Sequence, residues 1–117
     1  MNLKGKTIFI SGAARRIGRA LSLSLANEGA DIIIHHNSSQ EEAKSLKLEI
    51  EKLSQKAFIV QADFSDPKST QSLAQSVFSN HNVFGLINNA SLFTNLDFSD
   101  TSLDDWQDHL DVNLTHL

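Results

Sequence analysis

The sequence predicts an α/β fold, a doubly wound parallel sheet with helices on both faces. Short apolar runs alternate four times with segments whose apolar residues recur at helical spacing. Parallel strands joined by right-handed helical crossovers are the expected result of this alternation. With the crossover reversing after the third strand, the strand order is 3-2-1-4. We expect residues 1–117 to belong to one domain.

The first strand is expected near residues 6–11, where the run TIFI is partly β-branched and is closed by Ser-Gly. Ile17, Leu21 and Leu25 then recur at helical spacing. Gly29 follows this segment at the position of a C-terminal helix cap. The sequence therefore predicts a strand, a turn and a helix in that order.

The second strand is expected near residues 31–35, which include three consecutive isoleucines. Ser39 is placed to start the next helix. The apolar stripe of that helix is formed by Ala43, Leu46, Ile50 and Leu53.

The second half of the chain repeats the pattern. Strands are expected near 57–61 and 83–88, separated by a helix that Asp66 and Pro67 introduce. A last helix is expected over residues 103–117. The buried side of the middle helix is formed by Leu73, Val77 and Phe78.

The overall composition restricts the function classes. Hydrophobic residues make up 40% of the chain and charged residues 21%, as in soluble globular proteins. The net charge of −4 argues against nonspecific binding to nucleic acid or to an anionic membrane. There is no cysteine, and no apolar stretch is long enough for a signal peptide or a membrane span. We therefore expect a cytoplasmic protein with no nucleic-acid or membrane partner.

Ligands of such sheets bind beyond the carboxyl ends of the strands. The first loop places free N–H groups at a helix N-terminus, which favours a phosphate. Its glycines are Gly12 and Gly18, so the strict G-x-G-x-x-G pattern is absent. The alternative interpretation is a tight turn at the first glycine and close helix packing at the second.

The end of the second strand reads HHNSS and has no acidic residue before Glu41. An acid at this tip would bind a ribose 2′-hydroxyl, whereas Asn37, Ser38 and Ser39 can donate hydrogen bonds to a 2′-phosphate. Arg15 or Arg16 from the neighbouring loop would add charge-assisted bonds. These residues favour NADP(H), and the alternative is a polar turn with a helix cap. The two histidines are interpreted as strand-end residues and not as metal ligands.

Two further strand ends carry candidate ligand contacts. Asp63 is placed to accept from an adenine amino group, or else simply starts a loop. Residues 88–91 are small and polar, which suits backbone packed near a ligand. Phe93 is either a core residue or a ring that faces a flat substrate.

Five motifs in order, SGAARRIG, HHNSSQEEA, QADFSD, NNAS and DVNL, resemble the short-chain dehydrogenase/reductase family. The closest resemblance is to its pteridine reductase branch. That branch has a basic pair before the second matched glycine, a His/Asn/Ser-type tip and Asn-Asn-Ala-Ser followed by Phe. The resemblance implies a Rossmann-like fold that is incomplete at its C-terminus.

The resemblance assigns a cofactor role to each matched position. The first loop would bind pyrophosphate and ribose, with Arg16 in place of the family's usual middle glycine. The tip of the second strand and Arg15 would bind the 2′-phosphate, and later strand ends would bind adenine and the nicotinamide ribose. The implied cofactor-binding residues are Gly12, Arg15, Arg16, Ile17, Gly18, Asn37, Ser38, Ser39, Asp63, Phe64, Asn89 and Ala90.

The resemblance also implies substrate and relay residues. Ser91 and Phe93 match pterin-contacting positions, and Asn113 matches the asparagine that supports the proton relay. The family's catalytic tyrosine and lysine have no counterpart, because the chain has no tyrosine and no lysine after Lys68.

These residues predict the N-terminal, NADP(H)-binding half of an oxidoreductase. Its small-molecule substrate would be a carbonyl or imine compound, with a pteridine as one candidate. We expect the full-length enzyme to be a homo-oligomer, and the 117-residue chain to be inactive by itself. The alternatives are a stand-alone, non-catalytic nucleotide-binding module and a fragment with no independent activity.

Overall fold

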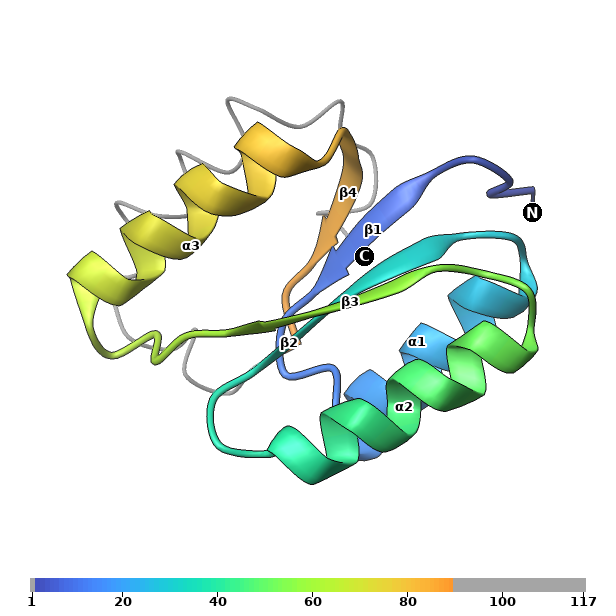
Figure 1. Cartoon of the computed structure of the whole chain (residues 1–117), viewed down its shortest axis with the longest axis horizontal. Helices are drawn as coiled ribbons and strands as arrows, with labels where there is room; N and C mark the ends of the chain where they lie inside the picture. Colours follow the sequence, from blue (N-terminus) through green and yellow to red (C-terminus); the bar gives the residue numbers. More distant parts are fainter. Residues whose placement is uncertain (1, 90–117) are drawn as a thin grey trace.

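Strands and helices alternate along the chain in the computed structural model, which describes residues 2–89 (Figure 1). Each strand lies within one residue of its predicted bounds. The helix expected over residues 103–117 lies outside the described residues. The elements are β1 Thr7–Ile10, α1 Arg16–Asn27, β2 Asp31–His36, α2 Gln40–Lys52, β3 Ala57–Gln61, α3 Pro67–Asn80 and β4 Val83–Ile87.

The strands form one parallel sheet in the order β3-β2-β1-β4, which confirms the predicted topology. In the centre of the sheet, Ile8 of β1 pairs with Ile32 of β2 on one side and with Gly85 of β4 on the other. Because all four strands run the same way, their carboxyl ends meet at one edge. The loops that follow β1, β2 and β4 therefore start close together.

Helices cover both faces of the sheet. α1 and α2 lie on one face and α3 lies on the other (Figure 1). Alternate residues of β2 point to opposite faces of the sheet. Ile32 and Ile34 pack in the hydrophobic cluster under α1 and α2, whereas Ile33 packs in the cluster under α3. Burial on both faces explains why the strand reads as a continuous apolar run.

The first helix ends at the glycine that the sequence indicated. Gly29 has φ +104°, which is the left-handed region, and its N–H donates to the carbonyl of Ala26. The next N–H, of Ala30, donates to the carbonyl of Leu25 at 3.1 Å. This pair of hydrogen bonds satisfies the last carbonyls of α1 and turns the chain into β2.

The buried face of α1 differs from the predicted apolar stripe. Leu25 is buried, but Ile17 is 69% exposed. The residues that α1 buries are Gly18, Ser22, Leu25 and Ala26. Helical spacing identifies a helix correctly, but the face that it buries depends on how closely the helix approaches the sheet, and small residues allow the closest approach.

The starts of α2 and α3 are built differently. Ser39 precedes α2, but its side chain makes no capping hydrogen bond, which corrects the expectation that it caps this helix. Asp66 caps α3 as predicted, because its Oδ1 accepts from the N–H of Lys68 at 3.1 Å and Pro67 opens the helix. At the far end of α2, Leu53 is the C-cap residue and is 38% exposed, so it adds little to the stripe.

Across residues 2–89, no helix has the length and apolar character needed to cross a membrane.

The two helix starts provide a matched test. Asp66→Ala should lower the free energy of unfolding by about 1 kcal/mol, because the N–H of Lys68 loses its acceptor. Ser39→Ala should change it by less than about 0.5 kcal/mol, because no capping bond is lost. Urea unfolding of both variants checks this. Equal losses would contradict the assignment of the caps.

Candidate functional site

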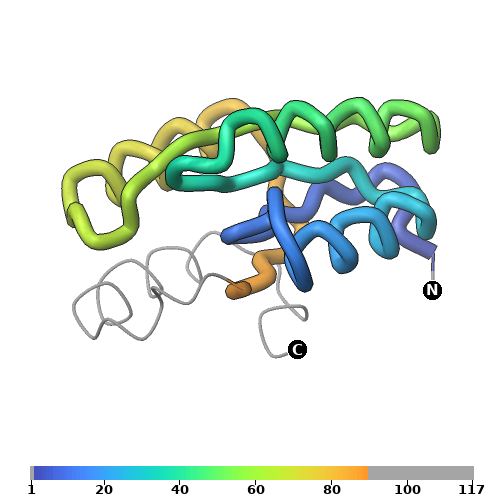
Figure 2. The backbone as a smooth tube through the Cα atoms, turned by 90° about the horizontal axis from the view of Figure 1, so that it is seen from below, coloured from blue at the N-terminus to red at the C-terminus, as the bar shows by residue number. Residues whose placement is uncertain are grey.

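The candidate site is built on the loop 11–15, which lies between the ends of β2 and β4. In Figure 2 the end of β4 runs beside this loop. The backbone N–H of Asn89 donates to Oγ of Ser11 at 2.8 Å, and Nδ2 of Asn89 donates to the carbonyl of Gly12 at 3.1 Å. Asn89, predicted to lie at the cofactor wall, therefore also holds the loop in place.

His35 ties the same loop to the other side of the sheet. Its Nδ1 accepts from the N–H of Gly12 at 3.0 Å, and its Nε2 lies 2.9 Å from the carbonyl oxygen of Ala62. Since Nδ1 accepts, the proton of the neutral ring is on Nε2, which donates to that carbonyl. The ring also stacks on Phe64, with centroids 4.0 Å apart.

The charge state of His35 follows from its burial. Desolvation lowers the pKa of His35 to about 4, with the bond to the Ala62 carbonyl opposing the shift and the nearby His36 adding to it. The ring is therefore neutral at pH 7, which keeps Nδ1 available as an acceptor. Sequence reasoning placed His35 at the strand end but missed this network, because its partners are residues that are distant in the chain.

Gly18 packs the start of α1 against the loop. A Cβ at this position would overlap the carbonyl oxygen of Gly12 and would lie 2.6 Å from Nδ2 of Asn89. Gly12 itself has φ +60°. The tight turn and the close helix packing considered from the sequence are thus both present.

Arg16 occupies a position that favours glycine. Its φ is +53°, in the left-handed region that other residues adopt at a cost of roughly 1 kcal/mol. The family that the sequence resembles usually has glycine here, and the backbone conformation gives the physical reason. Retaining arginine therefore stores a small strain at the start of α1.

A pocket of about 120 Å³ lies between this loop and the tip of β2. Its volume suits a group the size of a phosphate better than a whole nucleotide. Four residues predicted to bind a 2′-phosphate line it together, although they come from two separate loops. The lining residues are Gly12, Ala14, Arg15, His36, Asn37, Ser38 and Ser39.

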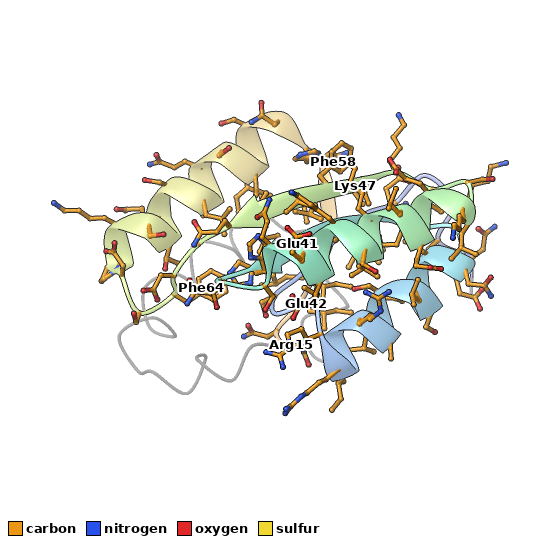
Figure 3. The ribbon with its side chains drawn as sticks, turned by 60° about the horizontal axis from the view of Figure 1, so that its bottom comes forward. Arg15, Glu41, Glu42, Lys47, Phe58 and Phe64 are labelled. Carbon is orange, nitrogen blue, oxygen red and sulfur yellow. The ribbon has the colours of Figure 1, made fainter. Side chains whose placement is uncertain are left out.

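The charge of this pocket comes from Arg15, and none of its lining residues is acidic. Arg15 Nε lies 3.5 Å from Oε2 of Glu42. Figure 3 shows Arg15, at the start of α1, and Glu42, on α2, reaching toward each other. Both are about half exposed, so this ion pair contributes at most about 1 kcal/mol. It orients the guanidinium without binding it tightly.

Asp63 stands at the end of β3, where its carboxylate closes a turn. Oδ1 accepts from the hydroxyl of Ser65 at 2.6 Å and from its N–H at 2.9 Å. These hydrogen bonds, the hydroxyl first, lower the pKa of Asp63 and keep it ionised. This geometry matches the loop-starting interpretation, and an adenine contact stays a prediction.

The remaining predicted residues, Ala90, Ser91, Phe93 and Asn113, lie outside the described residues. Within the described part, no three His, Asp or Glu side chains are grouped to hold a metal ion.

Comparison with known proteins identifies close relatives. The short chain dehydrogenase family matches residues 6–117. L-rhamnose 1-dehydrogenase (NAD(P)(+)) of Sphingomonas sp. (strain SKA58) is 35% identical over 113 residues, which are 96% of this chain and 44% of that enzyme. A short chain dehydrogenase from Burkholderia cenocepacia, solved in complex with NADP, superposes with a TM-score of 0.83 at 27% identity.

The chain covers a different share of each relative's length. It covers 53% of the Burkholderia structure, so it spans about half the length of that enzyme and of the rhamnose dehydrogenase. By contrast, it covers 93% of the short-chain dehydrogenase/reductase homolog YusS of Bacillus subtilis (strain 168), which is 33% identical over 101 residues.

The strain at Arg16 can be tested by relieving it. Arg16→Gly should raise the free energy of unfolding by about 1 kcal/mol, because glycine adopts positive φ without steric cost. Ser24→Gly is the control, since Ser24 is exposed inside α1, and it should lower stability by about 0.5–1 kcal/mol. Chemical denaturation measures both, and destabilisation by Arg16→Gly would refute the strain.

The buried His35 predicts acid sensitivity. Its pKa is lowered from 6.5 to about 4 in the folded state, so unfolding takes up a proton between these values. Stability contributed by the neutral ring is present above pH 6.5 and is lost as pH falls toward 4. We expect a loss of about 1.5 kcal/mol between pH 6.5 and about pH 5.

His35→Gln removes the titrating group and should flatten this part of the stability profile. Unfolding curves at several pH values test it, and an unchanged slope in the variant would assign the acid sensitivity to another group.

Proposed function

The chain belongs to the short-chain dehydrogenase/reductase family, and we propose that it forms the NADP(H)-binding part of a reductase. Its substrate would be a carbonyl or imine compound. The observation that carries this proposal is the pocket at the tip of β2, which Arg15 lines and which has no acidic residue. The nicotinamide cofactor would supply hydride when bound, and the residues described here would position it.

The choice of the phosphorylated cofactor rests on the chemistry of this pocket. A carboxylate at the end of β2 would favour a ribose 2′-hydroxyl and repel a 2′-phosphate. Here β2 ends in His36, followed by Asn37 and Ser38, whose side chains supply hydrogen-bond donors. The Burkholderia relative holds NADP, and the rhamnose dehydrogenase is named for both cofactors, which supports a site of this kind.

The pyrophosphate would bind over the loop 11–15 at the start of α1. Backbone N–H groups at a helix N-terminus favour an anion, and the missing side chain of Gly18 lets the helix and loop stay close. Ile17 is an exposed apolar residue in the first turn, which suits a contact with the cofactor better than a role in the core. Asn89 would border the nicotinamide ribose.

The reductive chemistry itself needs a proton donor. In the family this is a tyrosine, and the 117 residues contain none. Asn113 would support the relay, and Ser91 and Phe93 would contact the substrate, with a pterin as one candidate. We accordingly expect the chain by itself to be inactive. That the full-length enzyme forms a homo-oligomer is a separate part of the proposal.

The second candidate is a nucleotide-binding module that does not catalyse. The comparison with YusS favours it, because the aligned residues span 93% of that homolog. A family homolog of about this length therefore exists. Binding and turnover discriminate the two proposals. A full-length protein that binds NADPH but never oxidises it with pterins, quinones or aldehydes would favour the module.

Cofactor preference is tested by adding charge to the pocket. Ser38→Asp should weaken NADPH binding by at least about 10-fold, through repulsion between the new carboxylate and the 2′-phosphate, and should weaken NADH binding far less. Ser24→Asp adds the same charge on an exposed part of α1 and should leave both affinities unchanged. Calorimetric titration gives the dissociation constants, and equal affinities of the unchanged protein for NADPH and NADH would refute the preference.

A further inference from the structure

The loops after β1 and β3 start on either side of β2, because β2 lies between those two strands in the sheet. Neighbouring strands are about 4.8 Å apart, so strands on either side of a third are about 10 Å apart. A single backbone hydrogen bond is too short to join loops at this distance. The ring of His35, near the end of β2, joins them with a hydrogen bond on each side.

His35 holds the loop after β1 at two consecutive N–H groups. Its Nδ1 accepts from the N–H of Gly12 at 3.0 Å, and its backbone carbonyl accepts from the N–H of Ala13 at 2.9 Å. On the other side, Nε2 of the ring donates to the carbonyl of Ala62 at 2.9 Å. Ala62 directly precedes Asp63, which is predicted to contact adenine. One residue thus connects the loop proposed for the pyrophosphate with the loop proposed for the adenine.

The packing around the ring favours a single orientation. The side chain is buried, and the ring stacks on Phe64 with centroids 4.0 Å apart and an interplanar angle of 15°. The ring of Phe9 lies 6.1 Å away, centroid to centroid. A half-turn of the imidazole would place C–H groups against the N–H of Gly12 and the carbonyl of Ala62 and would leave both without this partner. The bridge is therefore oriented before any ligand binds.

Other hydrogen bonds at this edge act within one loop or on one loop. Asn89 binds Ser11 and Gly12, which belong to the loop after β1. Oδ1 of Asp63 accepts from Ser65 inside the loop after β3. These bonds stabilise each loop separately, whereas the ring of His35 sets the position of one loop relative to the other.

We propose that His35 is a positioning residue for the cofactor, because its ring sets the spacing at which the two loops receive the pyrophosphate and the adenine of one molecule. The inference rests on the proposed function. A ligand that contacts both loops binds more tightly when their spacing is fixed in advance, since less order has to be created on binding. A ligand that contacts only one loop gains little from the bridge.

Two substitutions each break one end of the bridge. In His35→Asn, the side-chain oxygen takes the place of Nδ1 and keeps the bond to Gly12, but the amide does not reach Ala62. In His35→Gln, the longer side chain reaches Ala62, while the N–H of Gly12 loses its acceptor. His81→Asn is the matched control, because it removes a ring that packs on Phe58 at the far end of α3.

The probes are ADP-ribose, which carries both adenine and pyrophosphate, and adenosine, which carries no phosphate. Both are titrated into the full-length protein at pH 7, where the ring is neutral. Each His35 variant should weaken binding of ADP-ribose about 10-fold, the effect of losing one buried hydrogen bond, and binding of adenosine less than about 2-fold. His81→Asn should leave both affinities unchanged. Unfolding curves show whether each variant is folded.

Hydrogen exchange tests the bridge in the unchanged protein. Saturating ADP-ribose should slow solvent exchange of the His35 Nε2–H at least about 10-fold, because this ligand binds best while the bridge is formed. Saturating adenosine should slow it less than about 2-fold. The N–H of Ile33, in the middle of β2, reports unfolding of the whole sheet and is the reference.

Equal losses for the two probes would make His35 a structural residue and overturn the inference, with the proposed function intact. Unchanged affinity for ADP-ribose in either His35 variant would also overturn it, because His35 would then act on one loop or on none. If neither variant folds, exchange decides, and slowing of the Nε2–H no greater than that of Ile33 would overturn the inference. Failure of the unchanged protein to bind both ADP-ribose and NADP⁺ would overturn the proposed function as well.

Discussion

The hydrogen bonds of His35 are the interaction on which the site depends. One neutral imidazole joins the N–H of Gly12 to the carbonyl of Ala62 and thereby connects the loop after β1 with the end of β3. From the other side, Asn89 binds the same loop through Ser11 and Gly12. The loop is thus positioned by strands on both sides of β1, and the start of α1 follows from it.

Two locally unfavourable features lie near this hydrogen-bond network. Arg16 takes a positive φ that favours glycine, and the Nε2–H of His36 is buried without a partner in the described part of the chain. His36 lines the pocket at the tip of β2, and Arg16 directly follows Arg15, which also lines it. Natural proteins concentrate such departures from local preference at functional sites, where a ligand completes what the fold leaves open.

The prediction of elements and the prediction of contacts succeeded to different degrees. The strands, the cap at Gly29 and the helix start at Asp66 were predicted correctly, since short apolar runs and capping residues act over a few positions. Ile17 was expected in an apolar stripe and is exposed, because the approach of α1 to the sheet selects Gly18 and Ser22 for its buried face. Spacing alone carries no information on that approach.

The sequence by itself determined the parallel α/β fold, the order of the strands and the residue types at their carboxyl ends, because alternation and right-handed crossovers leave few arrangements. It also indicated that Arg15, Asn37 and Ser38 belong to one site. Only the tertiary structure decided what the two histidines do. Adjacent residues of a strand point to opposite faces of the sheet, so His35 meets Phe64 on one face while His36 lines the pocket with Arg15. Those partners are distant in sequence, and folding alone brings them together.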